Sequence, residues 1–159
     1  MRLDRLTIPL VIACAGGLAL ALALVFVGAV LPVLPVWLNA LITVFAAVAS
    51  AVHGWFIVKA AFAIADPPKS ALETGRPPLE APDGTMRGGW MIGLLERTAT
   101  AVAIGVGQFG AVAVIVAVKA VGRFGELDKP ASRERFIIGT LASLGVAGLW
   151  GTVAYLFRT

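Results

Sequence analysis

The 159-residue sequence has very little of the chemistry from which active sites and metal centres are built. It contains one cysteine, Cys14, and one histidine, His53, which excludes an internal disulfide and a metal site rich in these residues. Phosphate-binding loops, nucleophile elbows and clusters of carboxylates are also absent. We therefore expect a non-enzymatic protein with no catalytic residue, no bound metal and no cofactor.

Charged residues are scarce as well, at 14% of the chain, whereas hydrophobic residues make up 59%. Four windows contain no charge at all, at residues 6–31, 36–58, 98–118 and 136–157. A helix of about 20 apolar residues crosses the roughly 30 Å hydrocarbon core of a bilayer. Because each window is long enough, the composition predicts an all-α polytopic membrane protein with four transmembrane helices.

The N-terminus begins like a secretory signal, because Arg2 and Arg5 precede an apolar run. The run continues to residue 31, about twice the length of a signal core, so we expect a retained helix. The residues that end at Cys14 also resemble those before a lipidated bacterial cysteine. A small buried thiol is the alternative that we favour for Cys14.

Proline and polar residues divide the chain into two predicted helical hairpins. Pro32 and Pro35 bracket a tight turn, and five prolines with mixed charge between Asp66 and Arg87 are typical of a loop without its own core. The predicted units are a first hairpin at 1–65 with helices at about 6–31 and 36–65, a polar loop at 66–87, and a second hairpin at 88–159 with helices at about 89–122 and 133–157.

The distribution of Lys and Arg beside the spans predicts the orientation, because cytoplasmic loops contain an excess of them. With four full spans, eight fall on the side of the N-terminus and five on the other. This majority favours a multi-pass protein of the bacterial inner membrane with both termini in the cytoplasm. A helix that turned back within the membrane would change the count. The net charge of +4 is spread over loops and membrane edges, so we expect membrane lipid and no nucleic acid as a partner.

Small residues recur at every fourth position of three predicted helices, and in lipid such faces allow two helix backbones to approach closely. The longest stripe lies on the fourth helix. We expect these faces to join the chain to itself, as a homo-oligomer, or to another membrane protein. The helix-packing residues are Gly107, Gly139, Ser143, Ala147 and Gly151.

Polar residues share one side of the second predicted helix, and His53 is among them. A lone histidine without a carboxylate in its own helix is expected to hydrogen-bond to neighbouring helices. The alternative is a hydrated path through the membrane, in which His53 binds a proton near neutral pH. The candidate path consists of Asn39, Ser50, His53, Thr100 and Gln108.

A carboxylate and a guanidinium, Glu96 and Arg97, lie beside each other near the start of the third span. Adjacent side chains point about 100° apart on a helix, so each needs a partner elsewhere. Arginine can extend to the headgroups, whereas the shorter glutamate cannot. We expect a charged network that fixes helix depth and binds lipid phosphate, with a substrate site as the alternative. Its members are Glu96, Arg97, Lys119, Arg123, Glu126, Glu134 and Arg135.

The second half of the chain resembles a domain-of-unknown-function family of bacterial inner-membrane proteins. The pattern, over residues 91–143, is IGxLER, then Lys and Arg-Phe at the end of a helix, then ER and IGTLxS. No activity comes with the resemblance. The matching positions are Gly93, Leu95, Glu96, Arg97, Lys119, Arg123, Phe124, Gly139, Thr140, Leu141 and Ser143.

Two functions agree with this sequence. The first is a non-enzymatic membrane assembly or accessory subunit that packs through its small-residue helix faces. The second is a small oligomeric transporter or channel, whose polar path uses Glu96 and His53. The sequence has more packing signals than chemistry, which favours the first.

Overall fold

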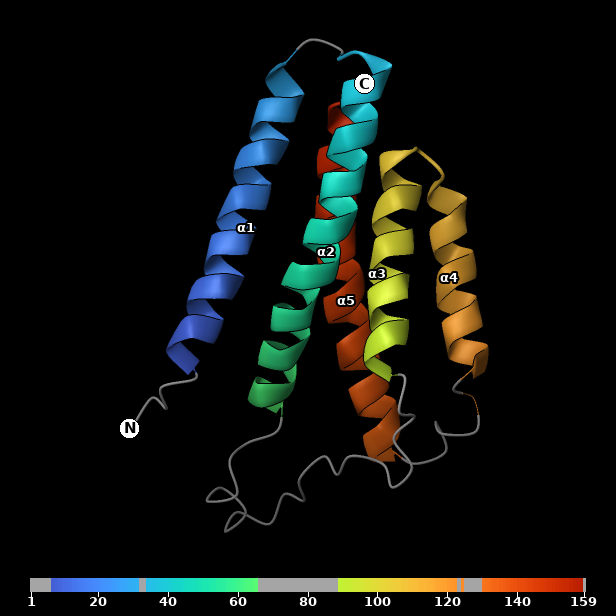
Figure 1. The fold of residues 1–159 in the computed structure, drawn as a ribbon. Helices are drawn as coiled ribbons and strands as arrows, with labels where there is room; N and C mark the ends of the chain where they lie inside the picture. The colour runs from blue at the N-terminus through green and yellow to red at the C-terminus, as the bar shows by residue number, and fades with distance from the viewer. Residues whose placement is uncertain (1–6, 32–33, 66–88, 123, 125–129, 159) are drawn as a thin grey trace.

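The computed structural model describes residues 7–31, 34–65, 89–122, 124 and 130–158, and these contain helices and no β-strand. The predicted all-α class is therefore confirmed, whereas the predicted polar loop at 66–87 lies outside the described residues. Figure 1 shows the helices side by side in one bundle. They are α1 (Thr7–Val30), α2 (Val36–Ala65), α3 (Gly89–Gly105), α4 (Phe109–Gly122) and α5 (Pro130–Leu156).

Three of these helices are long and apolar enough to cross a membrane, and they correspond to the first, second and fourth predicted spans. The apolar stretches are Ile8–Val30, Val36–Ala65 and Ser132–Leu156. The predicted continuous helix at 89–122 is wrong, because the structure divides it into α3, with 17 residues, and α4, with 14. Neither part has the roughly 20 residues that a crossing needs.

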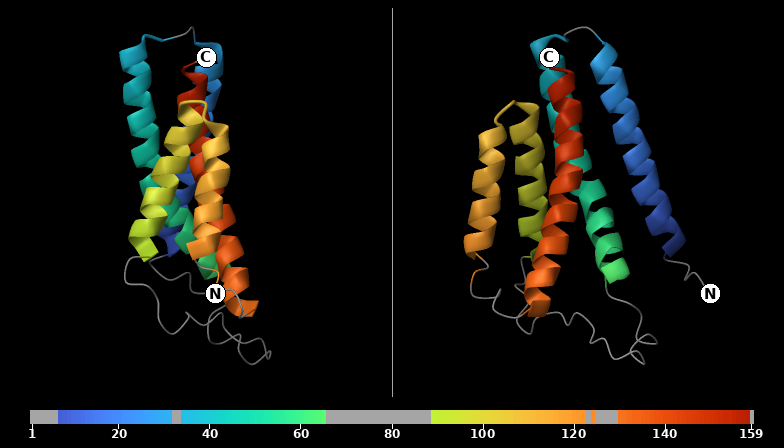
Figure 2. Two further views of the ribbon diagram at one scale, coloured as in Figure 1. Left: turned by 90° about the vertical axis from the view of Figure 1, so that its right-hand side faces the viewer. Right: turned by 180° about the vertical axis from the view of Figure 1, so that it is seen from behind.

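The division occurs at Gly107, whose φ of +77° belongs to the left-handed region that favours glycine. The Gly107 amide donates to the Ile104 carbonyl at 2.9 Å, and the Gln108 amide donates to the Ala103 carbonyl at 2.7 Å. This pair of bonds is the Schellman arrangement that ends many helices, since it satisfies the last free carbonyls. The chain then reverses, and α4 runs antiparallel to α3 (Figures 1 and 2).

The reversed hairpin is attached to the end of α5 at its tip. The Arg158 guanidinium donates to the Val106 carbonyl, and the Phe109 and Tyr155 rings meet edge to face with centroids 5.3 Å apart. A backbone carbonyl that has left the helical ladder needs a donor from elsewhere. Arg158 therefore supplies a donor to a carbonyl at the point where the α3 ladder stops.

The core forms where α5 packs against α2 and α3, and its largest fully buried side chain is that of Trp150. The small-residue face of α5 packs inside this core. A Cβ added to Gly151 would lie 2.7 Å from the Ile104 Cβ, and one added to Gly139 would lie 2.9 Å from the Phe62 ring. Ser143 and Ala147 are buried between these two glycines. The small residues of α5 therefore allow close approach to α2 and α3 of the same chain.

The two ends of the described chain lie at opposite ends of the bundle. Figure 1 shows α1 beginning at the lower end, whereas α5 finishes at the upper end. The expectation of both termini on one side depended on four crossings. The turn at Gly107 replaces one predicted crossing by a hairpin that returns to the end from which it started. The two ends of the described chain therefore lie at opposite ends of the bundle.

Candidate functional site

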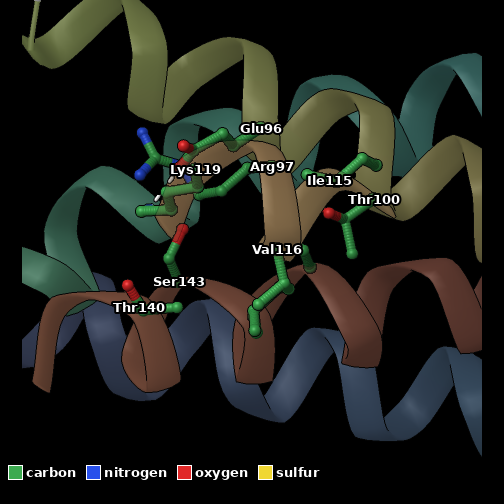
Figure 3. A pocket seen from close by; sticks show the side chains of 10 residues that line it. Glu96, Arg97, Thr100, Ile115, Val116, Lys119, Thr140 and Ser143 are labelled. Carbon is green, nitrogen blue, oxygen red and sulfur yellow. Dashed lines mark hydrogen bonds and ion pairs between the residues drawn. The ribbon is translucent and has the colours of Figure 1, made fainter. Parts of the chain in front are cut away.

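A small cavity lies among α3, α4 and α5, at the level of the residue pair that the sequence singled out (Figure 3). Its wall combines three charged side chains and three hydroxyls with an apolar remainder. About 10 Å³ is open to the centre of a water-sized occupant. The lining residues are Glu96, Arg97, Thr100, Ile115, Val116, Lys119, Thr140, Ser143, Leu144 and Ala147.

Glu96 and Lys119 form an ion pair that joins α3 to α4. The Lys119 ammonium donates to the Glu96 carboxylate, and the two side chains are 18% and 14% exposed. The turn explains the pairing, because Glu96 precedes Gly107 by 11 residues and Lys119 follows it by 12. Nearly equal distances from the turn along two antiparallel helices bring the side chains to one level. The sequence indicated both residues, but without the reversal they were expected at opposite ends of one helix.

Arg97 is buried, with 6% of the residue exposed, and its side chain crosses the face of α2 at Gly54. A Cβ at position 54 would collide with the Arg97 Cδ and lie 2.7 Å from the Nε. The Ser50 hydroxyl reaches the Arg97 backbone carbonyl at 3.4 Å, and in the described part of the chain the Nε has no hydrogen-bond partner. A buried cation without full hydrogen bonding is costly, which makes this position unusual.

Thr100 and Thr140 each present a buried hydroxyl that has no hydrogen-bond partner among the described residues. In a helix a threonine hydroxyl commonly donates to the carbonyl four residues earlier. Thr43, Thr98 and Thr152 do so, at 2.8, 2.9 and 2.8 Å respectively. The two cavity threonines leave this capacity unused. Figure 3 shows Thr140 with Ser143 below the charged group and Thr100 further along the cavity.

His53 lies outside the cavity, where α1, α2 and α5 meet. The Trp150 Nε1 donates to the His53 Nδ1 at 3.2 Å, so the proton of the neutral ring belongs on the Nε2. The Nε2 lies 3.1 Å from the Cys14 carbonyl, to which it donates. Gly17 makes room for the ring, because a Cβ there would lie 2.6 Å from it. Both ring nitrogens are satisfied, and the imidazole connects three helices.

The five residues of the predicted polar path do not form one group. The Asn39 amide donates to the Leu34 carbonyl at 3.0 Å near the start of α2, and Gln108 is exposed in the turn after α3. Ser50 contacts the α3 backbone, and His53 belongs to the three-helix junction. Only Thr100 lines the cavity, together with the charged residues.

The predicted charged network is likewise divided. Glu96, Arg97 and Lys119 meet at the cavity, whereas Glu134 is exposed near the start of α5. Arg135 lies over the Phe62 ring, with the guanidinium carbon 4.3 Å from the centroid. Arg123 and Glu126 lie outside the described residues. Across the helices that the structure describes, no group of three His, Cys, Asp or Glu side chains could hold a metal ion.

Two contributors to these sites were not anticipated from the sequence. Gly54 admits the Arg97 side chain, and Trp150 donates to His53. A glycine four residues after Ser50 was a weak signal, because glycines are frequent in this chain. No sequence pattern pairs a tryptophan with a histidine 97 positions away.

The described residues define a class: an all-α protein with three membrane-length helices and a shorter helical hairpin that lines a small cavity together with α5. The chain matches no protein-family model, no curated protein and no solved structure. The resemblance of residues 91–143 to a family of bacterial inner-membrane proteins stays a prediction.

Proposed function

We propose that the protein is an integral membrane protein of the bacterial inner membrane that transports a small ion at the α3–α4 hairpin. Three helices cross the bilayer, and the hairpin enters from one face and returns to it. The observation that supports this function is the ion pair of Glu96 with Lys119 beside the buried Arg97. Charges at this depth are rare in lipid and mark ion pathways where they occur.

The interrupted helix supports the same function. Non-helical backbone inside a membrane is tolerated where protein buries it or where it lines a cavity, and broken helices form the binding sites of many transporters. Here the break at Gly107 gives a short hairpin, attached at its tip to Arg158 and through α3 to α5. An arriving ion competes for Glu96 or Lys119, so opening their pair is the step that links binding to movement of α4.

The small-residue faces give less support to an assembly role than the sequence suggested. Gly139, Ser143, Ala147 and Gly151 face helices of the same chain, so this stripe of α5 is not available to a partner. The polar path predicted for a transporter or channel used both Glu96 and His53. In the structure Glu96 lines the cavity and His53 does not, so His53 is not part of the site that we propose. The ion site that we propose is therefore centred on Glu96, Arg97 and Lys119.

Ion flux in vesicles tests the transport function. We expect purified protein in proteoliposomes to dissipate an imposed ion gradient, and Glu96→Gln to reduce the rate at least tenfold, because it removes the charge that holds Lys119. Glu134→Gln is the matched control, since this carboxylate is exposed outside the cavity. Wild-type vesicles that pass none of proton, sodium, potassium or chloride, or two variants with equal rates, would contradict the function.

A second candidate is the accessory subunit, and α1 favours it. Only 6% of its membrane-length window is buried within the chain, against 33% for α2 and 39% for α5. A helix with so little intramolecular contact has its apolar sides available for a second copy or another membrane protein, in addition to lipid.

Cross-linking in native membranes tests this second candidate. Phe26 in α1 is 72% exposed, and we expect Phe26→Cys in a Cys14→Ser background to form a disulfide-linked species on mild oxidation. Val118→Cys, on the outer side of α4 at 67% exposure, is the control for random collision. Equal cross-linking at both positions would count against an interface on α1.

A further inference from the structure

We propose that Arg97 is the alternative counterion of Glu96 and keeps its carboxylate ionised when Lys119 moves away. This inference rests on the proposed function in one respect, since the opening of the Glu96–Lys119 pair is taken from it, but the protonation state of Glu96 is measured separately from flux. It depends on three features of the structure: one carboxylate beside two cations, a guanidinium held in place, and a helix α4 that packs loosely.

One carboxylate serves two cations at this level of the bundle. The Lys119 ammonium donates to the Glu96 carboxylate, and the charge of Glu96 also acts on the Arg97 guanidinium. All three side chains line the cavity of Figure 3, and its other lining residues are uncharged. The departure of Lys119 therefore leaves Glu96 with one cation of its own helix.

The Arg97 side chain is held where it can act on Glu96. Long side chains in a helix lean toward its N-terminus, so residues 96 and 97 both extend over the preceding turn of α3. Two glycines leave room there for Arg97, since a Cβ added to Gly54 would lie 2.7 Å from the Nε and one added to Gly93 would lie 3.3 Å from the Nη1. The Nε has no hydrogen-bond partner in the described part of the chain, so the guanidinium retains a donor that a carboxylate can use.

Lys119 can leave the pair, whereas Glu96 cannot follow it. None of the described residues of α4 is buried, and this helix packs mainly against α3. Lys119 lies three residues before the end of α4, about 5 Å along the helix, so its long side chain reaches the headgroups when α4 moves. The shorter Glu96 lies about 10 Å inside α3, where an unpaired carboxylate is costly.

The presence of Arg97 decides what happens to the carboxylate after Lys119 has left. A carboxylate without a counterion in apolar surroundings binds a proton, because the neutral acid is less costly to bury than the charge. A guanidinium beside it removes this cost, since arginine stays protonated in proteins. Glu96 thus keeps its negative charge in both positions of α4, and Lys119 can return to it. Arg97 is in this sense a positioning residue.

Infrared spectroscopy of the purified full chain in detergent tests the proposal, because a protonated carboxylic acid has a carbonyl band that a carboxylate lacks. At neutral pH we expect no such band from Glu96 in the wild type or in Lys119→Met. Lys119→Met combined with Arg97→Met should gain the band of about one protonated acid per chain, because no cation is left beside the carboxylate. Lys119→Met combined with Arg97→Lys retains a cation and should again lack the band.

Two further substitutions assign the band. Glu96→Gln, added to the protein that lacks both cations, should remove it. Glu134→Gln is the matched control and should leave it, since Glu134 is exposed near the start of α5. Gly93→Val in the Lys119→Met background is the second route if the loss of Arg97 prevents folding. Its branched side chain displaces the Nη1 but keeps both charged residues, and it should produce the band.

The band of Glu96 in Lys119→Met alone overturns the proposal, because Arg97 then does not keep the carboxylate ionised. Absence of the band from a folded protein without either cation, or from Gly93→Val with Lys119→Met where that double variant fails to fold, overturns it as well.

The counterion role and transport can fail separately. An ionised Glu96 in Lys119→Met that depends on Arg97, in a protein whose vesicles pass no ion, supports the counterion role and contradicts the transport function. Ion flux that depends on Glu96, in a protein whose Lys119→Met variant shows a protonated Glu96, supports the transport function and overturns the counterion role.

Discussion

Buried polar side chains in this bundle fall into two groups that have different consequences. Both ring nitrogens of His53 are satisfied, by Trp150 and by the Cys14 carbonyl, so the ring has a fixed tautomer and a fixed position. The Nε of Arg97 and the hydroxyls of Thr100 and Thr140 have no such partners in the described part of the chain. Satisfied groups define the packing of helices, whereas unsatisfied groups beside a cavity indicate where a ligand can bind.

The Trp150–His53 hydrogen bond leads to a prediction about stability. Trp150→Phe leaves the buried His53 Nδ1 without a donor, and we expect a loss of about 2–4 kcal/mol in the free energy of unfolding, from the unpaired group together with lost packing. The measurement is thermal or denaturant unfolding in detergent. Trp37→Phe is the control, because Trp37 is 66% exposed, and it should change stability by about 0.5 kcal/mol or less.

A double-variant cycle separates the hydrogen bond from packing. In Trp150→Phe with His53→Leu no polar group is left unpaired, so the double variant should lose at least about 1 kcal/mol less than the sum of the two single losses. Additive losses would show that the hydrogen bond does not contribute to stability.

At the scale of the helices, one residue decides the architecture of the second half. Residues 98–118 form an uncharged run of the length that a bilayer requires, and composition alone predicts a continuous span. The left-handed backbone of Gly107 ends α3 instead, and the reversal brings Lys119 beside Glu96. Packing of α3 against α5, the Arg158 contact and the ion pair all stabilise the hairpin over the straight helix.

Substitution at the turn tests this account. Gly107→Ala places a Cβ on a residue with φ of +77°, which costs about 1–2 kcal/mol in a left-handed conformation, and we expect the stability to fall by that amount. Gly110→Ala is the control, because a Cβ there meets nothing within 4 Å, and it should leave stability unchanged or slightly raised. A Gly107→Ala protein as stable as Gly110→Ala would show that the chain can continue as a straight helix. Unfolding in detergent provides the measurement.

The Lys and Arg residues of the sequence are distributed unevenly between the segments that flank the two ends of the described helices. The starts of α1, α3 and α5 lie at the same end of the bundle as the finishes of α2 and α4 (Figure 1). Eleven of the 13 Lys and Arg residues belong in the sequence to segments that begin or finish at that end; Arg97 lies midway along α3, and Arg158 is at the opposite end. With four spans, eight Lys and Arg residues fell on the side of the N-terminus and five on the other side. With the hairpin in place of one span, the difference between the two sides becomes larger.

This asymmetry predicts the orientation in the membrane. Because Lys and Arg are retained on the cytoplasmic side, we expect the N-terminus and the segment 66–88 in the cytoplasm and the C-terminus outside. A fluorescent protein fused after residue 159 should therefore stay dark, and alkaline phosphatase at the same position should be active. Fusions inserted near residue 75 are the control and should give the opposite pair of results. A fluorescent C-terminal fusion would contradict the three-crossing arrangement.

The sequence by itself determined the helical class and predicted the three membrane-length helices, although it also predicted a fourth span that the structure divides, because hydrophobic length is a local property. It indicated positions 96, 97 and 119 for a similar reason, since the cost of charge in an apolar run is local. The tertiary structure alone decided how these residues meet. Whether Gly107 ends a helix depends on what the reversed chain packs against, and α5 and Arg158 are distant in sequence. The same holds for Trp150 with His53 and for Gly54 with Arg97, since contacts between helices follow from packing rather than from any period along the chain.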